Sequence, residues 1–148
     1  MQSTHASDDP VNAPRFVLPV RVYYEDTDAA GVVYYANYLR FCERARTEWL
    51  REIGFEQQRM LEQDGMAFVV RSVKADYLAP ARLDDALSVV TTIDALRRAS
   101  ITFGQKIVRA ETVLFSADIQ VACVDWQRKK PAPLPDTVRT QLEKIKTA

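Results

Sequence analysis

Histidine is almost absent from this sequence. The only one among its 148 residues is His5, in the polar segment before Pro14, where no fixed side-chain geometry is expected. We therefore predict that the folded part has no serine–histidine or cysteine–histidine triad and no histidine-based zinc site. Cysteine is scarce as well. Cys42 and Cys123 each lie within an apolar pattern, so they are interpreted as buried free thiols rather than as a secreted disulfide framework.

Excess charge and long apolar runs are also lacking. Twenty Lys and Arg balance twenty Asp and Glu, so the net charge suggests neither nucleic acid nor a membrane surface as a partner. No apolar run approaches the length of a membrane span, and residues 1–10 do not have the pattern of a signal peptide. We expect a cytoplasmic protein with a mobile tail over residues 1–14 and one domain over residues 15–148.

Hydrophobic periodicity predicts the elements of this domain. A strand is expected over residues 16–24, followed by a helix from about Ala36 to Ile53 with apolar residues three and four positions apart. Gly54 ends this helix, and a short second helix is expected over residues 56–64. Apolar residues then alternate, which predicts strands. These strands cover residues 69–77, 87–95, 101–107 and 113–123, and a short amphipathic helix follows the turn at residues 131–135.

This order predicts an α+β fold with a five-stranded antiparallel sheet. Short polar turns separate the last three strands, which should pair antiparallel. A helix of about 18 residues is about 27 Å long and can lie along one face of the sheet. One helix does not cover a whole sheet, and the long strand over residues 113–123 offers an edge to another chain. An oligomer, at least a dimer, is therefore expected.

The chemically dense segment runs from Tyr23 to Asn37. Asp26 and Asp28 would share one face if the first strand continued that far, although acidic residues before a helix are often only solvated or capping groups. Gly31 allows a positive φ or a close approach of the backbone to a ligand. The helix then begins near Tyr35 with unpaired N–H groups that suit a developing oxyanion. A carboxylate beside such donors favours attack on an activated acyl group such as a thioester.

The residues of this segment also resemble a known family. The likeness is carried by VRVYYEDTDAAGVVYYANYLRFCERARTEWLR, FVVRSVKADYLAPARLDDAL and VACVDWQRKKPAPLP. These blocks resemble the bacterial Tol–Pal-associated acyl-CoA thioesterases and the broader 4-hydroxybenzoyl-CoA thioesterase group. The resemblance implies the hotdog fold, in which a sheet wraps around one long helix, and it implies hydrolysis of an acyl-CoA to the free acid and coenzyme A.

The resemblance also implies which residues form the site. Asp28 would be the catalytic carboxylate, and the N–H near Tyr35 would polarise the thioester carbonyl. Tyr35 stands where Tol–Pal-associated members commonly have histidine. The backbone N–H at this position can still polarise the carbonyl, but proton transfer by an imidazole is not possible here. Gly31 and Val33 would belong to the substrate-binding loop. The resemblance further implies an acidic group near the site at Glu43, although an ion pair with Arg40 or Arg46 is the favoured interpretation of this residue. It also implies a coenzyme A phosphate contact at Arg97, Arg98 and Ser100, for which a polar hairpin tip is the alternative.

The sequence also leaves alternatives open for the mechanism, the oligomeric state and the function. Asp28 could act as nucleophile or as general base, and the oligomer could be a dimer or a tetramer. A hotdog hydratase or dehydratase is disfavoured. Such enzymes usually pair a carboxylate with a histidine, and the expected folded core has no histidine. A binding module for acyl carrier protein or phospholipid-synthesis enzymes, with little hydrolysis, is the alternative function. A metal site made by Glu25, Asp26 and Asp28 is a weaker alternative because three adjacent carboxylates give incomplete coordination. No cofactor and no resident metal are expected.

Overall fold

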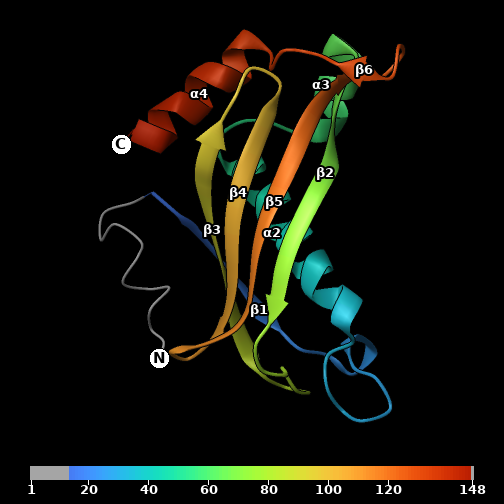
Figure 1. Cartoon of the computed structure of the whole chain (residues 1–148), viewed down its shortest axis with the longest axis vertical. Coiled ribbons are helices and arrows are strands. Elements are labelled where there is room, and N and C mark those ends of the chain that lie inside the picture. The colour runs from blue at the N-terminus through green and yellow to red at the C-terminus, as the bar shows by residue number, and fades with distance from the viewer. Residues whose placement is uncertain (1–13, 148) are drawn as a thin grey trace.

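The computed structural model describes residues 14–147, so the predicted tail lies almost wholly outside the described residues. Figure 1 shows an antiparallel sheet that curves across the helix α2 (Tyr35–Glu52), with further helices at one end of the sheet. This arrangement confirms the predicted α+β hotdog fold. The strands are β1 (Phe16–Arg21), β2 (Met66–Tyr77), β3 (Ala86–Leu96), β4 (Ser100–Arg109), β5 (Thr112–Asp125) and β6 (Lys130–Pro131); the other helices are η1 (Tyr24–Asp26), α3 (Gln57–Asp64) and α4 (Asp136–Thr147).

The strand order is β1-β3-β4-β5-β2, with the two-residue β6 attached to β5. The last three long strands pair antiparallel as predicted. The expectation that residues 113–123 form an open edge is wrong, because β5 lies between β4 and β2. Its second partner, β2, is separated from it in the chain by two strands, β3 and β4. Alternation within one segment does not identify so distant a partner. The long strand at the edge of the sheet is β2.

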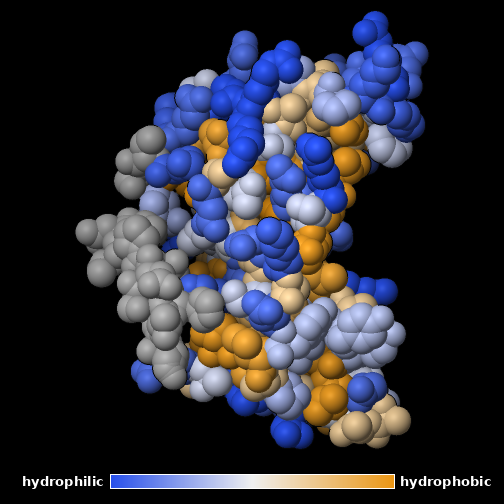
Figure 2. Space-filling view, in the orientation of Figure 1, coloured by the Kyte–Doolittle hydropathy of each residue, from blue (hydrophilic) through white to orange (hydrophobic). Residues whose placement is uncertain are grey.

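β2 is exposed on both faces over much of its length. Residues 69–74 are all exposed. If other elements covered one face of this strand, every second residue would be buried. Three valines in this stretch are among the exposed large hydrophobic residues: Val69 at 37%, Val70 at 49% and Val73 at 40%. Figure 2 shows hydrophobic side chains at the surface along the side of the molecule where β2 lies. The chain therefore has an apolar strand edge that its own elements leave open.

The helix α2 buries the apolar stripe that its sequence predicts. Tyr38, Phe41, Cys42, Ala45 and Trp49 are buried against the sheet. Trp49 stacks on Phe16 of β1 with ring centroids 6.1 Å apart. Both cysteines are buried and free, and burial raises the pKa of the Cys42 thiol to about 12.

One charged residue lies on this buried face. Arg46 is only 7% exposed, and its Nη1 donates a hydrogen bond to Oε1 of Gln105 on β4 at 2.8 Å. Nε2 of Gln105 donates to the carbonyl oxygen of Cys42 at 3.0 Å and to Oγ1 of Thr91 on β3 at 2.9 Å. Gln105 and Thr91 are also buried. This network joins α2 to the centre of the sheet, and its buried polar groups satisfy one another's hydrogen bonds.

Candidate functional site

The predicted catalytic segment is an ordered loop between β1 and α2. β1 ends at Arg21, and residues 24–26 form η1, so Asp26 and Asp28 do not share a strand face as the sequence suggested. Oδ2 of Asp26 accepts the N–H of Tyr23 at 2.9 Å. The carbonyl oxygen of Asp26 accepts the N–H of Tyr34 at 3.0 Å and Nδ2 of Asn37 at 2.9 Å. Asp26 therefore ties the loop to the start of α2.

Asp28 begins a tight turn within this loop. Its N–H donates to the carbonyl oxygen of Val32 at 2.9 Å, and its carbonyl oxygen accepts the N–H of Gly31 at 3.0 Å. Oδ1 accepts the N–H of Ala30 at 2.9 Å, which orients the carboxylate from its own backbone. Gly31 has φ of +81°, a left-handed conformation that favours glycine. Asp28 is exposed, so a fixed carboxylate faces solvent at the end of the turn.

The start of α2 lies directly beside this turn. Thr27 and Val33 pair as an isolated antiparallel bridge that closes the loop. Val33 itself is buried in the core and its N–H donates to the carbonyl oxygen of Ala81 at 2.8 Å, so it anchors the loop from inside. Within the described chain, the N–H groups of Tyr35 and Ala36 donate to no acceptor. These two groups, at the positive end of the helix dipole, are available to an oxyanion.

Tyrosines form a rim around the helix start. The rings of Tyr34 and Tyr35 lie 4.8 Å apart, and that of Tyr77 on β2 lies 6.4 Å from Tyr35. The hydroxyl of Tyr77 donates to the carbonyl oxygen of Tyr35 at 3.1 Å. A hydrogen bond with Tyr35 raises the pKa of Tyr34, and burial raises the pKa of Tyr77. Neither of these phenols is ionised at neutral pH, so they add hydroxyl groups and ring faces to the site without adding negative charge.

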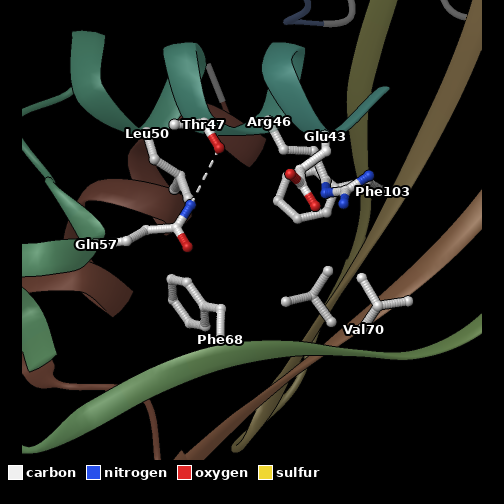
Figure 3. Close-up of a pocket in the computed structure, with 9 residues that line it drawn as sticks. Glu43, Arg46, Thr47, Leu50, Gln57, Phe68, Val70 and Phe103 are labelled. Carbon is white, nitrogen blue, oxygen red and sulfur yellow. Dashed lines mark hydrogen bonds between the residues drawn. The ribbon is translucent and has the colours of Figure 1, made fainter. Parts of the chain in front are cut away.

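A cavity of about 400 Å³ lies further along α2, between the helix and the sheet. Figure 3 shows Glu43, Arg46 and Thr47 projecting from α2 toward it, with Phe68 and Val70 of β2 on the opposite side. Glu43 is exposed and lines this cavity. In the described chain it forms no ion pair, so the expected pairing with Arg40 or Arg46 is wrong, although its charge acts on Arg46 through space. The residues that line the cavity are Glu43, Arg46, Thr47, Leu50, Gln57, Phe68, Val70, Phe103 and Val121.

The predicted phosphate-binding residues lie at the other end of the sheet. Arg97 and Arg98 are exposed in the turn between β3 and β4. Ser100 is buried as the first residue of β4, so its hydroxyl is not part of the exposed turn. The turn also carries the C-terminal segment, since the carbonyl oxygen of Arg98 accepts the N–H of Leu134 at 2.9 Å. The turn lies at one end of β3 and the end of β1 at the other, and the 11 residues of β3 span about 33 Å.

The described residues contain neither a metal-binding cluster nor a membrane-spanning helix. Over residues 14–147, no group of three or more His, Cys, Asp or Glu side chains is arranged to hold a metal ion, including Glu25, Asp26 and Asp28. None of the helices in the same range is long and apolar enough to cross a membrane.

Sequence reasoning missed three residues of this region. Tyr77 lies on a strand far along the chain, and only the pairing of β2 brings it to the helix start. Arg46 and Gln105 interrupt the apolar patterns of α2 and β4 at positions that face inward. A charged or amide residue at a buried position of an amphipathic pattern is the signal that would have found both.

Comparisons with known proteins agree with this architecture. A family model described as the thioesterase-like superfamily matches residues 22–142. The acyl-CoA thioesterase YbgC of Haemophilus influenzae is 48% identical over 131 residues, which cover 88% of this chain and 96% of that protein. The acyl-CoA thioester hydrolase YbgC of an Escherichia coli O6:H1 strain is 51% identical over 129 residues, which cover 86% of this chain and 96% of that protein.

Solved structures agree as well. A probable thioesterase from Bartonella henselae is 36% identical with a TM-score of 0.78, covering 82% of this chain and 99% of that one. The 1,4-dihydroxy-2-naphthoyl-CoA thioesterase Slr0204 from Synechocystis is 29% identical with a TM-score of 0.82, covering 88% of this chain and 97% of that one. With a family model that spans most of the chain and relatives this similar, the chain belongs to the thioesterase-like superfamily.

Proposed function

We propose that this chain hydrolyses acyl-CoA thioesters to the free acid and coenzyme A, with Asp28 as the catalytic carboxylate. The observation that carries the proposal is the exposed Asp28 on a rigid turn, beside a helix start whose N–H groups at Tyr35 and Ala36 have no partner in the described chain. The names of the relatives from Haemophilus influenzae and Escherichia coli support the same substrate class.

The arrangement suits thioester chemistry. The thioester carbonyl oxygen would accept the N–H of Tyr35, which would stabilise the negative charge that develops during attack. Asp28 would remove a proton from the attacking water, or it would itself attack the carbonyl carbon and form a mixed anhydride that water then hydrolyses to the free acid and Asp28. The carbon–sulfur bond then breaks, and the thiolate of coenzyme A leaves and takes up a proton. Tyr34 and Tyr77, whose phenols are neutral, would border the acyl group without repelling the developing oxyanion.

A hydrolysis assay across short, long and aromatic acyl-CoAs tests this function. Release of free thiol above the background rate is expected with at least one of these classes. Binding without turnover across all of them would contradict the proposal and would favour the binding-module alternative. Association with Tol–Pal proteins or acyl carrier protein, and a cytoplasmic location, remain predictions.

We further propose that two chains pair through their β2 edges. The strand is long, unpaired on its outer side and exposed on both faces, and it carries Val69, Val70 and Val73 at the surface. Such an edge on a soluble protein calls for a partner strand. A two-fold axis between two copies would pair the β2 strands antiparallel and would cover the valines of both.

The chain is therefore expected to sediment as a dimer or a larger oligomer. Sedimentation velocity at micromolar concentration should give a mass at least twice the 16.8 kDa of one chain. Replacing Val73 with lysine places two like charges near the axis and should weaken this association. A wild-type protein that sediments only as a monomer at this concentration would contradict pairing through β2.

Antiparallel pairing would also bring the distant arginines to the site. The turn that holds Arg97 and Arg98 and the loop that holds Asp28 lie at opposite ends of one sheet. In a two-fold dimer, each end of one sheet lies beside the opposite end of the other. Arg97 and Arg98 of one chain would then contact the phosphates of a coenzyme A whose thioester lies at Asp28 of its partner.

Replacing both Arg97 and Arg98 with alanine should raise the KM for an acyl-CoA about 10-fold or more and flatten its salt dependence. Hydrolysis of a truncated thioester that lacks the nucleotide should be nearly unchanged. Equal losses on the two substrates would instead indicate damage to the fold.

Mixed dimers decide whether the arginines act across the interface. One chain would carry Asp28→Asn and the other Arg97→Ala with Arg98→Ala. If each site takes Asp28 from one chain and the arginines from its partner, a mixed dimer has one intact site, and mixing two poor enzymes should restore activity. If both groups come from the same chain, neither site is intact and mixing should restore none.

A further inference from the structure

We propose that the cavity between α2 and the sheet binds a carboxylate carried on an apolar chain, with Arg46 as the residue that holds the carboxylate. The cavity of about 400 Å³ has a size that suits a small ligand. Its walls include Leu50, Phe68, Phe103 and Val121, which are apolar. Arg46 brings a buried positive charge to this apolar space.

Arg46 is poorly neutralised for a residue so deeply buried. Of its five N–H donors, the described chain accepts one, through a neutral amide oxygen of Gln105. Glu43 acts on it electrostatically but forms no ion pair with it, and Glu43 itself is exposed. Burial also lowers the pKa of the guanidinium, and the charge of Glu43 opposes this effect. Buried charges in proteins are normally paired, so this guanidinium suits an anionic ligand.

The combination identifies the ligand class. An inorganic anion would leave the apolar walls uncovered, and a purely apolar ligand would leave the charge of Arg46 unpaired. A carboxylate with a straight apolar chain satisfies both parts of the cavity, because a guanidinium can hold a carboxylate through two parallel hydrogen bonds. Figure 3 shows Arg46 and the apolar side chains of β2 on opposite sides of the cavity, which is the arrangement that such a ligand requires.

Two sources could supply this ligand. Arg46 is eleven residues after Tyr35 on α2, so it lies about 16 Å along the helix from the proposed oxyanion donor. An acyl group that runs beneath α2 from that donor could end in a second carboxylate at Arg46, an assignment that rests on the proposed function. A free carboxylic acid, such as a released product, could instead bind directly in the cavity.

Titration with octanoate, with octan-1-ol as the uncharged control, tests the site. Octanoate should bind saturably and shift the methyl NMR signals of Leu50, Val70 and Val121. Arg46→Gln keeps a polar side chain without the charge and should weaken octanoate binding about 10-fold or more. Arg40→Gln, an exposed change on the same helix, should have no effect. Octan-1-ol should bind at least 10-fold more weakly than octanoate to the wild-type protein.

The proposal is overturned if octanoate leaves these methyl signals unchanged, if octan-1-ol binds equally well, or if Arg46→Gln binds octanoate like the wild type. Arg46→Lys keeps the charge and should retain most of the binding, so it serves if Arg46→Gln does not fold. The binding measurement needs no turnover. If the chain binds octanoate but hydrolyses no acyl-CoA, the proposed function is contradicted and the carboxylate site at Arg46 is still supported.

Hydrolysis separates the two sources. The coenzyme A monothioester of a straight-chain dicarboxylic acid would be compared with the methyl-ended acyl-CoA of equal length. A preference for the dicarboxylic substrate that Arg46→Gln abolishes assigns the carboxylate to the acyl group. Equal hydrolysis rates for the two substrates, together with inhibition by octanoate, assign the bound carboxylate to a free acid. Either result supports a carboxylate site at Arg46.

Discussion

Replacing Asp28 with asparagine should lower the turnover number for a good acyl-CoA by about 100-fold or more, the scale expected when a nucleophile or general base is lost. The exchange keeps the shape of the side chain and an oxygen that can accept the N–H of Ala30 at the position of Oδ1. The turn should therefore persist, and KM should change little. Steady-state kinetics, with circular dichroism to verify the fold, make this measurement.

Asp26→Asn is the matched control. Oδ2 of Asp26 accepts the N–H of Tyr23, and an asparagine oxygen can accept the same bond. Because the proposed role of Asp26 is to fix the loop, the control should retain activity within a few-fold of the wild type. Full activity in Asp28→Asn, or equal losses in the two variants, would contradict the assignment of catalysis to Asp28.

Single-turnover hydrolysis in oxygen-18 water addresses the role of Asp28. Label incorporated into Asp28 would show that a mixed anhydride forms and that water attacks the carbonyl carbon of the enzyme. An unlabelled Asp28 is compatible with direct attack by water and also with attack on the acyl carbonyl of the anhydride. A positive result is therefore the decisive one.

Replacing Gln105 with leucine should destabilise the protein by about 2–4 kcal/mol. Leucine is similar in size, but it removes the bonds to the carbonyl oxygen of Cys42 and to Oγ1 of Thr91, and it removes the acceptor for Arg46. Arg46 would then be a buried cation with no hydrogen-bond acceptor in the described chain. The melting temperature should fall by roughly 5–15 °C.

Gln120→Leu on the neighbouring strand β5 is the control. Gln120 is half-buried, and Oγ of Ser72 donates a long hydrogen bond of 3.4 Å to its Oε1. Its loss should change the free energy of unfolding by less than about 0.5 kcal/mol. Both variants must be compared at the same protein concentration because association contributes to stability. Equal melting temperatures for wild type and Gln105→Leu would show that the buried network contributes little.

The sequence by itself determined the local elements and the position of the loop that carries Asp28. The apolar stripe of α2, the alternation in β3 to β5 and the Gly54 helix end all predict structure within a few residues, because these patterns follow from side-chain direction along one segment. Gly31 was likewise predictable as a position of positive φ. Asp28 and the helix start at Tyr35 are close in the chain, so their proximity could be predicted without knowing any contact between distant segments.

Only the tertiary structure decided the features that depend on pairing between distant segments. The antiparallel pairing of β2 with β5 moved the open edge from residues 113–123 to β2 and placed Tyr77 beside Tyr35. The same topology put Arg97 and Asp28 at opposite ends of the sheet, and the packing of α2 on β4 joined Arg46 to Gln105. Periodicity specifies which face of an element is apolar, but it does not specify which other element covers that face, because many partners satisfy the same pattern.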